Sequence, residues 1–227
     1  MLPFRGFVSF ASAFLLAVLL AGLWATGSAV LLRIGRGDEG EGLRDGALAL
    51  GLPVGLVLLA LPGWLLSAFG RAPFWAVLSL GGAFAAAALV ACVLGLPPLR
   101  AERPTASGVA PVLLVLGLFA AYLWLRLGWP DVRGTEKPMD FAVLSGLLET
   151  PRLPFEDPWF AGERFPYYHF GTLVLALPFR LASVPAEYAY NLVVALVAAL
   201  AGGAAFGLVR LRGGGRAVAV AAALLLV

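Results

Sequence analysis

The chain has 227 residues, of which 61% are hydrophobic and 13% are charged, and its mean hydropathy is +0.94. These values exclude an ordinary soluble domain and are typical of a polytopic membrane protein. The length of the chain therefore limits the number of membrane spans, not the number of soluble domains. The formal net charge of +3 comes mostly from arginines at the ends of apolar runs, and no basic stripe with interleaved aromatic residues predicts a nucleic-acid partner.

Three uncharged runs in the first half of the chain are each long enough to cross a hydrocarbon core of about 30 Å. They are Phe7–Leu32, Ala47–Phe69 and Phe74–Leu96. The first run is too long for the apolar core of a cleaved signal peptide, so we expect it to remain as a span. The glycine-rich segment Arg33–Gly46 has mixed charge and predicts a flexible loop. Together with a Pro-rich linker after the third run, these spans predict an N-terminal membrane region over residues 1–108.

The second half predicts three further spans and a shorter apolar run. The spans are Val109–Leu125, Tyr168–Leu181 and Ala186–Val209. The last run, Ala217–Val227, has about half the residues needed to cross a bilayer at about 1.5 Å per residue. We therefore expect an all-α polytopic integral membrane protein with six complete transmembrane helices and a partial seventh. We also expect the chain to be a fragment of a longer protein.

The spans themselves offer little polar chemistry. Their interiors contain no Asp, Lys or Arg, and His169 and Glu187 lie near span ends. This pattern disfavours a transporter or proton pump, because such proteins meet a coupling ion or a substrate charge inside the membrane. Two pairs of glycines have the GxxxG spacing that allows close helix approach, namely Gly51 with Gly55 and Gly203 with Gly207.

Residues 128–167 form a large polar loop between the fourth and fifth predicted spans. The stretch Trp129–Gly171 holds seven of the thirteen acidic residues, the only Lys and the only His. Within it, Pro138 suits the first turn of a helix, and we predict an amphipathic interfacial helix that ends at Thr150, before a second proline. The chemistry of the protein is therefore expected in this loop.

Asp140 lies in the middle of the apolar face of this predicted helix, among Val143, Leu144 and Leu147. A carboxylate placed there must lose water unless a polar cavity lies beneath it. One interpretation is a first-turn acid that is stabilised by the helix macrodipole. The other is a general base in a cleft between the helix and the spans, which Glu136, four residues earlier, would also face.

Two further groups in the loop have a structural and a functional interpretation. Asp157 either closes a turn through its own backbone or acts as an electrostatic partner or metal ligand opposite Asp140. Tyr167, Tyr168 and His169 form either an aromatic belt at the membrane interface or a set of substrate contacts. The acidic residues do not have the spacing of a known metal-binding motif. The cofactor is therefore unknown, and the sequence neither indicates nor excludes a divalent metal.

Three short segments of the loop carry a resemblance to a known family. They are Gly134–Ala142 (GTEKPMDFA), Asp157–Gly162 (DPWFAG) and Tyr167–Gly171 (YYHFG). In their order and spacing after the fourth span, they resemble the YYY (DUF2298) family of highly hydrophobic membrane proteins. Where the family pattern has Asn followed by three Tyr, this chain has PYYH at residues 166–169.

That family in turn resembles the GT-C membrane glycosyltransferases, which take a sugar from a polyprenyl-phosphate carrier. The resemblance implies that residues 109–227 begin a GT-C-like core in a multi-pass protein of the plasma membrane. It also implies that Asp140 is the catalytic base that deprotonates an acceptor hydroxyl at the outer membrane face, with Glu136 as the second candidate.

The same resemblance implies substrate-binding roles for other residues of the loop. Asp157 is expected to add a supporting charge, and the cations of the loop are expected to neutralise the leaving phosphate. The residues expected on the donor side are Tyr167, Tyr168, His169, Lys137, Arg152 and Arg164. The expected partners are membrane lipid and a lipid-linked sugar donor. The alternative is a non-catalytic membrane protein whose outer loop binds lipid or a partner protein.

Overall fold

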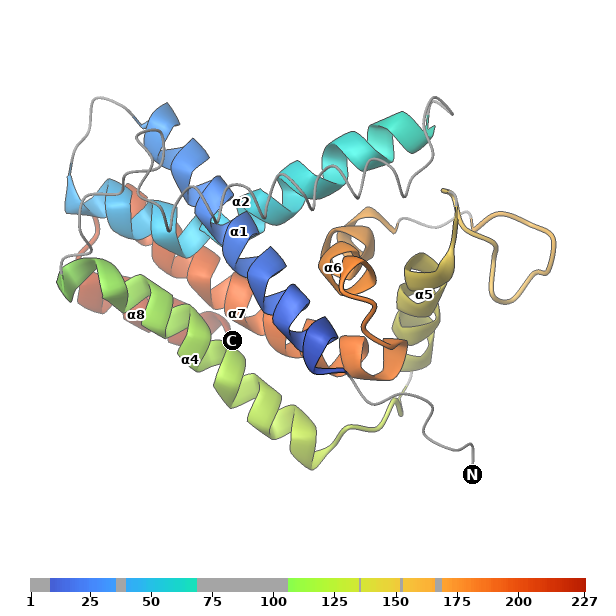
Figure 1. Cartoon of the computed structure of the whole chain (residues 1–227). Coiled ribbons are helices and arrows are strands. Elements are labelled where there is room, and N and C mark those ends of the chain that lie inside the picture. The colour runs from blue at the N-terminus through green and yellow to red at the C-terminus, as the bar shows by residue number, and fades with distance from the viewer. Residues whose placement is uncertain (1–8, 36–39, 69–105, 135, 152, 166–168) are drawn as a thin grey trace.

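The computed structural model describes residues 9–35, 40–68, 106–134, 136–151, 153–165 and 169–227, and the regular structure in this part of the chain is helical apart from one isolated β-bridge. Figure 1 shows the arrangement of the helices, which are α1 (Phe10–Ile34), α2 (Glu41–Ala68), α4 (Ala106–Gly128), α5 (Lys137–Glu149), α6 (Phe170–Leu181), α7 (Ala186–Leu211) and α8 (Arg216–Leu226). The predicted all-α fold is therefore confirmed.

Four of these helices are long and apolar enough to span a membrane. They are α1, the part of α2 from Glu41 to Leu65, the part of α4 from Val109 to Gly128, and α7, with lengths of 25, 25, 20 and 26 residues. At about 1.5 Å per residue each covers a hydrocarbon core of about 30 Å. Large apolar side chains such as Phe14, Leu116 and Leu208 are exposed on their outer faces. Because water would be an unfavourable neighbour for these faces, the chain is a membrane protein whose long helices contact lipid.

Helix α6 does not cross the membrane, so the prediction that Tyr168–Leu181 is a complete span is wrong. The helix has 12 residues, which cover only about 18 Å. Phe170, its first residue, packs edge-on against Trp64 near the end of α2, with the ring centroids 5.5 Å apart. Its last residue leads through a short turn into the start of α7. Since both ends of α6 lie at the same end of the long helices, α6 is not one of the six complete spans that the sequence predicted, and the described residues contain four candidate spans.

The other predicted spans agree with the described helices within a few residues, with two qualifications. The predicted third span, Phe74–Leu96, and most of the linker after it lie outside the described residues. Helix α8 has 11 residues, which is the length of the predicted half-crossing. The turn before it, at residues 212–215, contains Gly213 with φ of +80°, a conformation that glycine adopts without strain.

The predicted loop Arg33–Gly46 is shorter than expected, because α2 already begins at Glu41. Its second turn carries Asp45, which is only 1% exposed. One carboxylate oxygen, Oδ2, accepts hydrogen bonds from Nε of Arg210 and from Nε of Arg216, both at 2.8 Å. Arg216 also lies 3.4 Å from Glu41. This ion cluster holds the start of α2 in helical form against the end of α7 and the start of α8.

Glycines bring α2 unusually close to its neighbour α1. A Cβ atom added at Gly55 would lie 2.0 Å from the carbonyl oxygen of Leu23, and one added at Gly27 would lie 1.9 Å from the carbonyl oxygen of Gly51. On the other side of α2, a Cβ atom at Gly207 would lie 2.8 Å from Leu50. The close helix approach predicted from the two GxxxG pairs is therefore confirmed at both.

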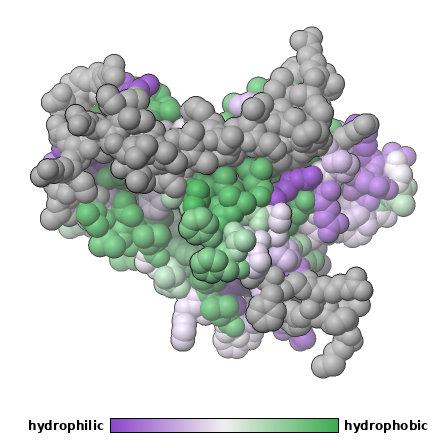
Figure 2. Space-filling model, viewed as in Figure 1, coloured by the Kyte–Doolittle hydropathy of each residue, from purple (hydrophilic) through white to green (hydrophobic). Residues whose placement is uncertain are grey.

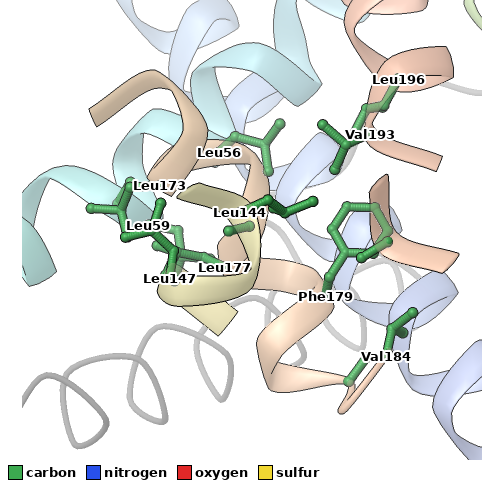
Figure 3. Close-up of a cluster of buried hydrophobic side chains, with 14 of the residues drawn as sticks. Leu56, Leu59, Leu144, Leu147, Leu173, Leu177, Phe179, Val184, Val193 and Leu196 are labelled. Atoms are coloured by element: carbon green, nitrogen blue, oxygen red, sulfur yellow. The ribbon is translucent and has the colours of Figure 1, made fainter. Parts of the chain in front are cut away.

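The largest apolar core unites α1, α2, α5, α6 and α7 at one end of the bundle. Figure 3 shows Leu144 and Leu147 of α5 beside Leu173 and Leu177 of α6, with side chains of α2 next to them. All four leucines are at most 1% exposed. Helix α5 is therefore fixed on the ends of the spans by its apolar face, and this contact positions the residues of its polar margin.

We predict that Gly55→Ala lowers stability, because the new methyl group has no room between α1 and α2. Overpacking of this kind typically costs about 1–3 kcal/mol. The matched control is Gly117→Ala in α4, where no atom lies within 4 Å of the added Cβ. Replacing a helical glycine there should be neutral or stabilising by up to about 1 kcal/mol. Thermal unfolding of both variants in one detergent measures the difference, and equal midpoints would contradict the close contact.

Candidate functional site

The candidate site is built around the first turn of α5, which begins as the sequence predicts. Pro138 lies in the first turn, and Glu136 precedes the helix without a side-chain cap. The helix ends at Glu149, and Thr150 donates its backbone N–H to the Gly146 carbonyl at 2.9 Å. Figure 2 shows that hydrophilic residues gather over the end of the molecule that carries α5 and the loop after it, while hydrophobic residues cover the middle.

Asp140 forms part of the wall of a cavity between α5, α6 and α7. The cavity has a volume of about 310 Å³ and is lined by Asp140, Leu144, Thr172, Leu175, Tyr190, Val193, Val194 and Val197. Asp140 is exposed, whereas Leu144, one turn later on the same side of α5, is 1% exposed. The carboxylate therefore lies at the open margin of the apolar face and not buried in its middle, because the cavity separates it from the core.

The surroundings of Asp140 favour its neutral form. Partial burial raises the pKa of Asp140 above its ordinary value, and the negative charge of Glu136 raises it further. Glu136 is exposed one turn before Asp140, and the backbone N–H of Asp140 donates to the Glu136 carbonyl at 3.0 Å. In its ionised form, a carboxylate with a raised pKa is a stronger base than an ordinary one.

The cavity is amphipathic along its length. Asp140, Thr172 and the phenol of Tyr190 supply its polar groups, and the remaining lining residues are Leu and Val. Along α7 the lining runs from Tyr190 to Val197, seven residues and about 10 Å further into the span. Val194 and Val197 are 38% and 46% exposed. The cavity therefore starts at a polar rim and opens toward lipid at its apolar end.

Tyr190 belongs to the polar rim and Arg126, outside the cavity lining, packs against its ring; sequence reasoning missed both. Tyr190 is 5% exposed and packs edge-on against Phe141 at 5.6 Å between ring centroids. The guanidinium carbon of Arg126, near the end of α4, lies 5.5 Å from the Tyr190 ring centroid. This cation–π contact typically contributes about 0.5–2 kcal/mol. It fixes the tyrosine ring beside Asp140.

Arg126 also orders the chain that leads from α4 toward α5. Its two terminal nitrogens donate to the carbonyl oxygens of Trp129, Pro130 and Asp131, at 2.6, 3.1 and 3.0 Å. The signal for Arg126 in the sequence is a cation in the last turn of an apolar helix, where it also offsets the helix dipole. Tyr190 gives no such signal, because a tyrosine near a span end is expected in many membrane proteins.

Asp157 has the turn-closing geometry that the sequence offered as one alternative. Its Oδ1 accepts from the backbone N–H groups of Trp159 and Phe160, at 2.8 and 3.2 Å, and the residue is 8% exposed. The flanking segments pair across the turn, with an isolated bridge between Glu156 and Arg164. The result is an ordered hairpin that presents Trp159 and Phe160 at its tip, with both side chains exposed.

The structure does not bring the remaining described candidates into the lining of the cavity. None of Asp157, His169, Lys137 and Arg164 is among the described residues that line it. His169 packs edge-on against Phe155, at 5.6 Å between ring centroids, and precedes the first turn of α6.

Lys137 is three residues before Asp140, so the two are neighbours on the surface of α5. Lys137 and Arg164 are both exposed. Tyr167, Tyr168 and Arg152 lie outside the described residues. Within the described part of the chain, no three His, Cys, Asp or Glu residues gather as metal ligands would.

These observations define a polytopic helical membrane protein with an amphipathic cavity at one end of its spans. The chain belongs to the DUF2298 family of uncharacterized membrane proteins, whose family model matches residues 58–227. The family that the loop segments resemble is therefore the family of this chain. No curated protein and no solved structure matches the chain.

Proposed function

We propose that this chain is a GT-C-like membrane glycosyltransferase that moves a sugar from a polyprenyl-phosphate donor to an acceptor hydroxyl. One observation carries the proposal. A carboxylate with a raised pKa stands at the polar rim of an amphipathic cavity that opens to lipid, which suits a base acting on a substrate at the membrane surface. In this proposal residues 109–227 contribute the GT-C-like part, and residues 1–108 form a membrane region that supports it.

In the proposed reaction Asp140 takes the proton of the acceptor hydroxyl. The acceptor oxygen then attacks the anomeric carbon of the sugar, and the bond from that carbon to the phosphate oxygen breaks. The leaving polyprenyl phosphate needs neutralisation, and Lys137, one turn from Asp140 on the surface of α5, is the nearest proposed source. Arg164 is the second proposed cation, and Glu136 keeps the pKa of Asp140 high.

We assign the donor side to the loop residues that the family resemblance names. His169 packs edge-on against Phe155 just before α6, and we assign it to the donor side on the family resemblance. Tyr167 and Tyr168, which lie outside the described residues, are assigned to the donor side on the family resemblance alone. Asp157 has its Oδ1 engaged by two backbone N–H groups, so its proposed contribution is to hold the hairpin that frames the donor side.

The proposed topology puts α5 at the outer face of the plasma membrane. Because α6 does not cross, the turn after α7 lies at the same end as the start of α2, where it pairs with Asp45. This end therefore collects arginines from both the first and the last part of the chain. The described ones are Arg33, Arg44, Arg210, Arg212 and Arg216. The end that carries α5 has equally many described cations, namely Arg126, Arg133, Lys137, Arg164 and Arg180, so the charge count favours neither orientation and the proposed topology rests on the GT-C resemblance.

Cysteine labelling tests the topology. In a Cys92→Ala background, Arg133→Cys should react with a membrane-impermeant maleimide in intact cells, since the Arg133 side chain is 86% exposed on the α5 side. Arg212→Cys, exposed at the other end, should react only after the cells are permeabilised. The reverse pattern would put Asp140 inside the cell and remove the proposed reaction at the outer face.

Replacing Asp140 tests its role as base. In the full-length protein, Asp140→Asn keeps the shape of the side chain but cannot accept the proton, so turnover should fall about 10²-fold or more. The control is Glu149→Gln, an exposed carboxylate at the other end of α5, which should keep normal turnover. The measurement is transfer of labelled sugar from a polyprenyl-phosphate donor, at equal abundance of the variants in the membrane.

Two results of this experiment would separate the proposal from its alternative. Normal turnover in Asp140→Asn would leave the residue as a first-turn helix acid and move the role of base to Glu136. No transfer by the unmodified full-length protein would favour the non-catalytic alternative, in which the outer loop binds lipid or a partner protein. The exposed Trp159 and Phe160 at the hairpin tip are the feature that such a partner would contact.

The pH dependence separates Asp140 from Glu136. If ionised Asp140 is the base, turnover falls as the pH drops through its raised pKa. Glu136→Gln removes one of the two causes of that rise, so the pKa of Asp140 falls toward its ordinary value. The acidic limb of the pH–turnover profile should therefore shift to lower pH, with the plateau unchanged. A loss of about 10²-fold at the plateau would instead identify Glu136 as the base.

A further inference from the structure

The polar groups of the cavity suit a hydroxyl group better than a phosphate. Asp140 accepts hydrogen bonds, while Thr172 and Tyr190 can each donate one. An alcohol both donates and accepts, so it can satisfy these groups together. A phosphate at the same place would lie beside a like charge, and no Lys or Arg is among the described residues that line the cavity.

The apolar part of the cavity suits a single hydrocarbon chain. Five Leu and Val side chains line it, and its α7 wall extends about 10 Å from Tyr190 to Val197. The volume of about 310 Å³ equals that of about ten water molecules in the liquid, each with a share of about 30 Å³. Because Val194 and Val197 are partly exposed at the lipid side, a longer chain can leave the cavity there and continue into the bilayer.

We infer that the cavity binds a membrane lipid with a neutral hydroxylated head group, and that this lipid is the acceptor of the transferred sugar. The second half of the inference rests on the proposed function. The hydrocarbon chain lies along α7 between α6 and α5, and the hydroxyl lies at Asp140. The donor approaches from outside the cavity, where Lys137 is exposed beside Asp140 on the surface of α5.

In this step the hydroxyl proton goes to the Asp140 carboxylate. The freed electron pair on the lipid oxygen forms the new bond to the anomeric carbon of the donor sugar. The bond between that carbon and the phosphate oxygen breaks, and the electron pair leaves with the polyprenyl phosphate. Atoms and charge balance, because the proton held by Asp140 is later released to water and no oxidant or reductant takes part.

Photolabelling tests the binding half of the inference without any turnover. The full-length protein in phosphatidylcholine nanodiscs is labelled with hexadecanol that carries a mid-chain diazirine, and in parallel with the phosphate monoester of the same molecule. The alcohol should label peptides of α6 and α7, and the phosphate should label them about tenfold less, since one like charge within about 10 Å is enough for this ratio. In Asp140→Asn the difference between the two probes should shrink.

A cavity-filling variant provides the matched comparison. Val194→Trp places a large side chain in the cavity and should reduce labelling by the alcohol about tenfold or more. Leu208→Trp, on the same helix but outside the cavity, should leave labelling unchanged, since Leu208 is 56% exposed. Labelling that survives in Val194→Trp, or equal labelling of α7 by both probes in the unmodified protein, would overturn the inference. The ratio between the probes decides the question even when Val194→Trp does not fold.

The acceptor half of the inference is tested separately by following labelled sugar. In the full-length protein the label should enter the lipid fraction, and Val194→Trp should abolish this while Leu208→Trp should not. Transfer to a water-soluble or protein hydroxyl at an unchanged rate in Val194→Trp would overturn the inference and leave the proposed glycosyltransferase intact. Selective binding of the alcohol with no sugar transfer at all would overturn the proposed function and leave the lipid site.

Discussion

The buried carboxylate of Asp45 determines how the helices are arranged. It accepts from two guanidinium groups that come from the end of α7 and the start of α8, 165 and 171 residues away along the chain. Together with Glu41, the two acids and two arginines form a nearly neutral cluster. Removing one member of a buried ion pair typically costs about 3–5 kcal/mol, because its partner is left without compensation. The cluster therefore requires the start of α2 and the end of α7 to meet.

The position of the candidate site follows from this contact. Since α7 ends beside the start of α2 and is long enough to span the membrane, it begins at the other end of the bundle. The turn between α6 and α7 then lies at that end too, and the 12 residues of α6 cannot be a crossing. Helix α6 instead covers the ends of the long helices and meets α5 there. The cavity between α5, α6 and α7 exists because this short helix is turned away from the direction of the spans.

The regular part of the fold could be predicted from the sequence, because a long uncharged run in a membrane has few alternatives to a helix. The start of α5 at Pro138 and the close approach at Gly51 and Gly55 were also predictable, since each depends on local spacing or on a single missing side chain. Helix α6 was not predictable in this way. Fourteen mostly apolar residues fit a short span and an interfacial helix equally well, and the 12-residue length of the helix and the contact of Trp64 with Phe170 distinguish them.

The candidate site was predictable only where one segment contains the signal. Asp140 and Glu136 lie four residues apart on one helix, so their proximity follows from the sequence. Tyr190 and Arg126 reach the same place from two different spans, and nothing near either residue indicates that they meet. The contacts of Asp45 were not predictable either. An Asp in a glycine-rich polar segment does not indicate that two arginines from the last part of the chain, Arg210 and Arg216, will pair with it.

The carboxylate of Asp140 lines the cavity and the ammonium group of Lys137 does not, which matters for any reaction at this site. Asp140 faces a cavity with hydroxyl and phenol groups, while Lys137, its exposed neighbour three residues earlier on α5, is not among the residues that line this cavity. A base needs an environment that keeps its pKa high, and a phosphate needs one that keeps its charge neutralised. Placed together, a cation at the carboxylate would lower the pKa and weaken the base. The first turn of α5 meets both requirements. Glu136 keeps the pKa of Asp140 raised, and Lys137 supplies a positive charge for the phosphate nearby on the same helix.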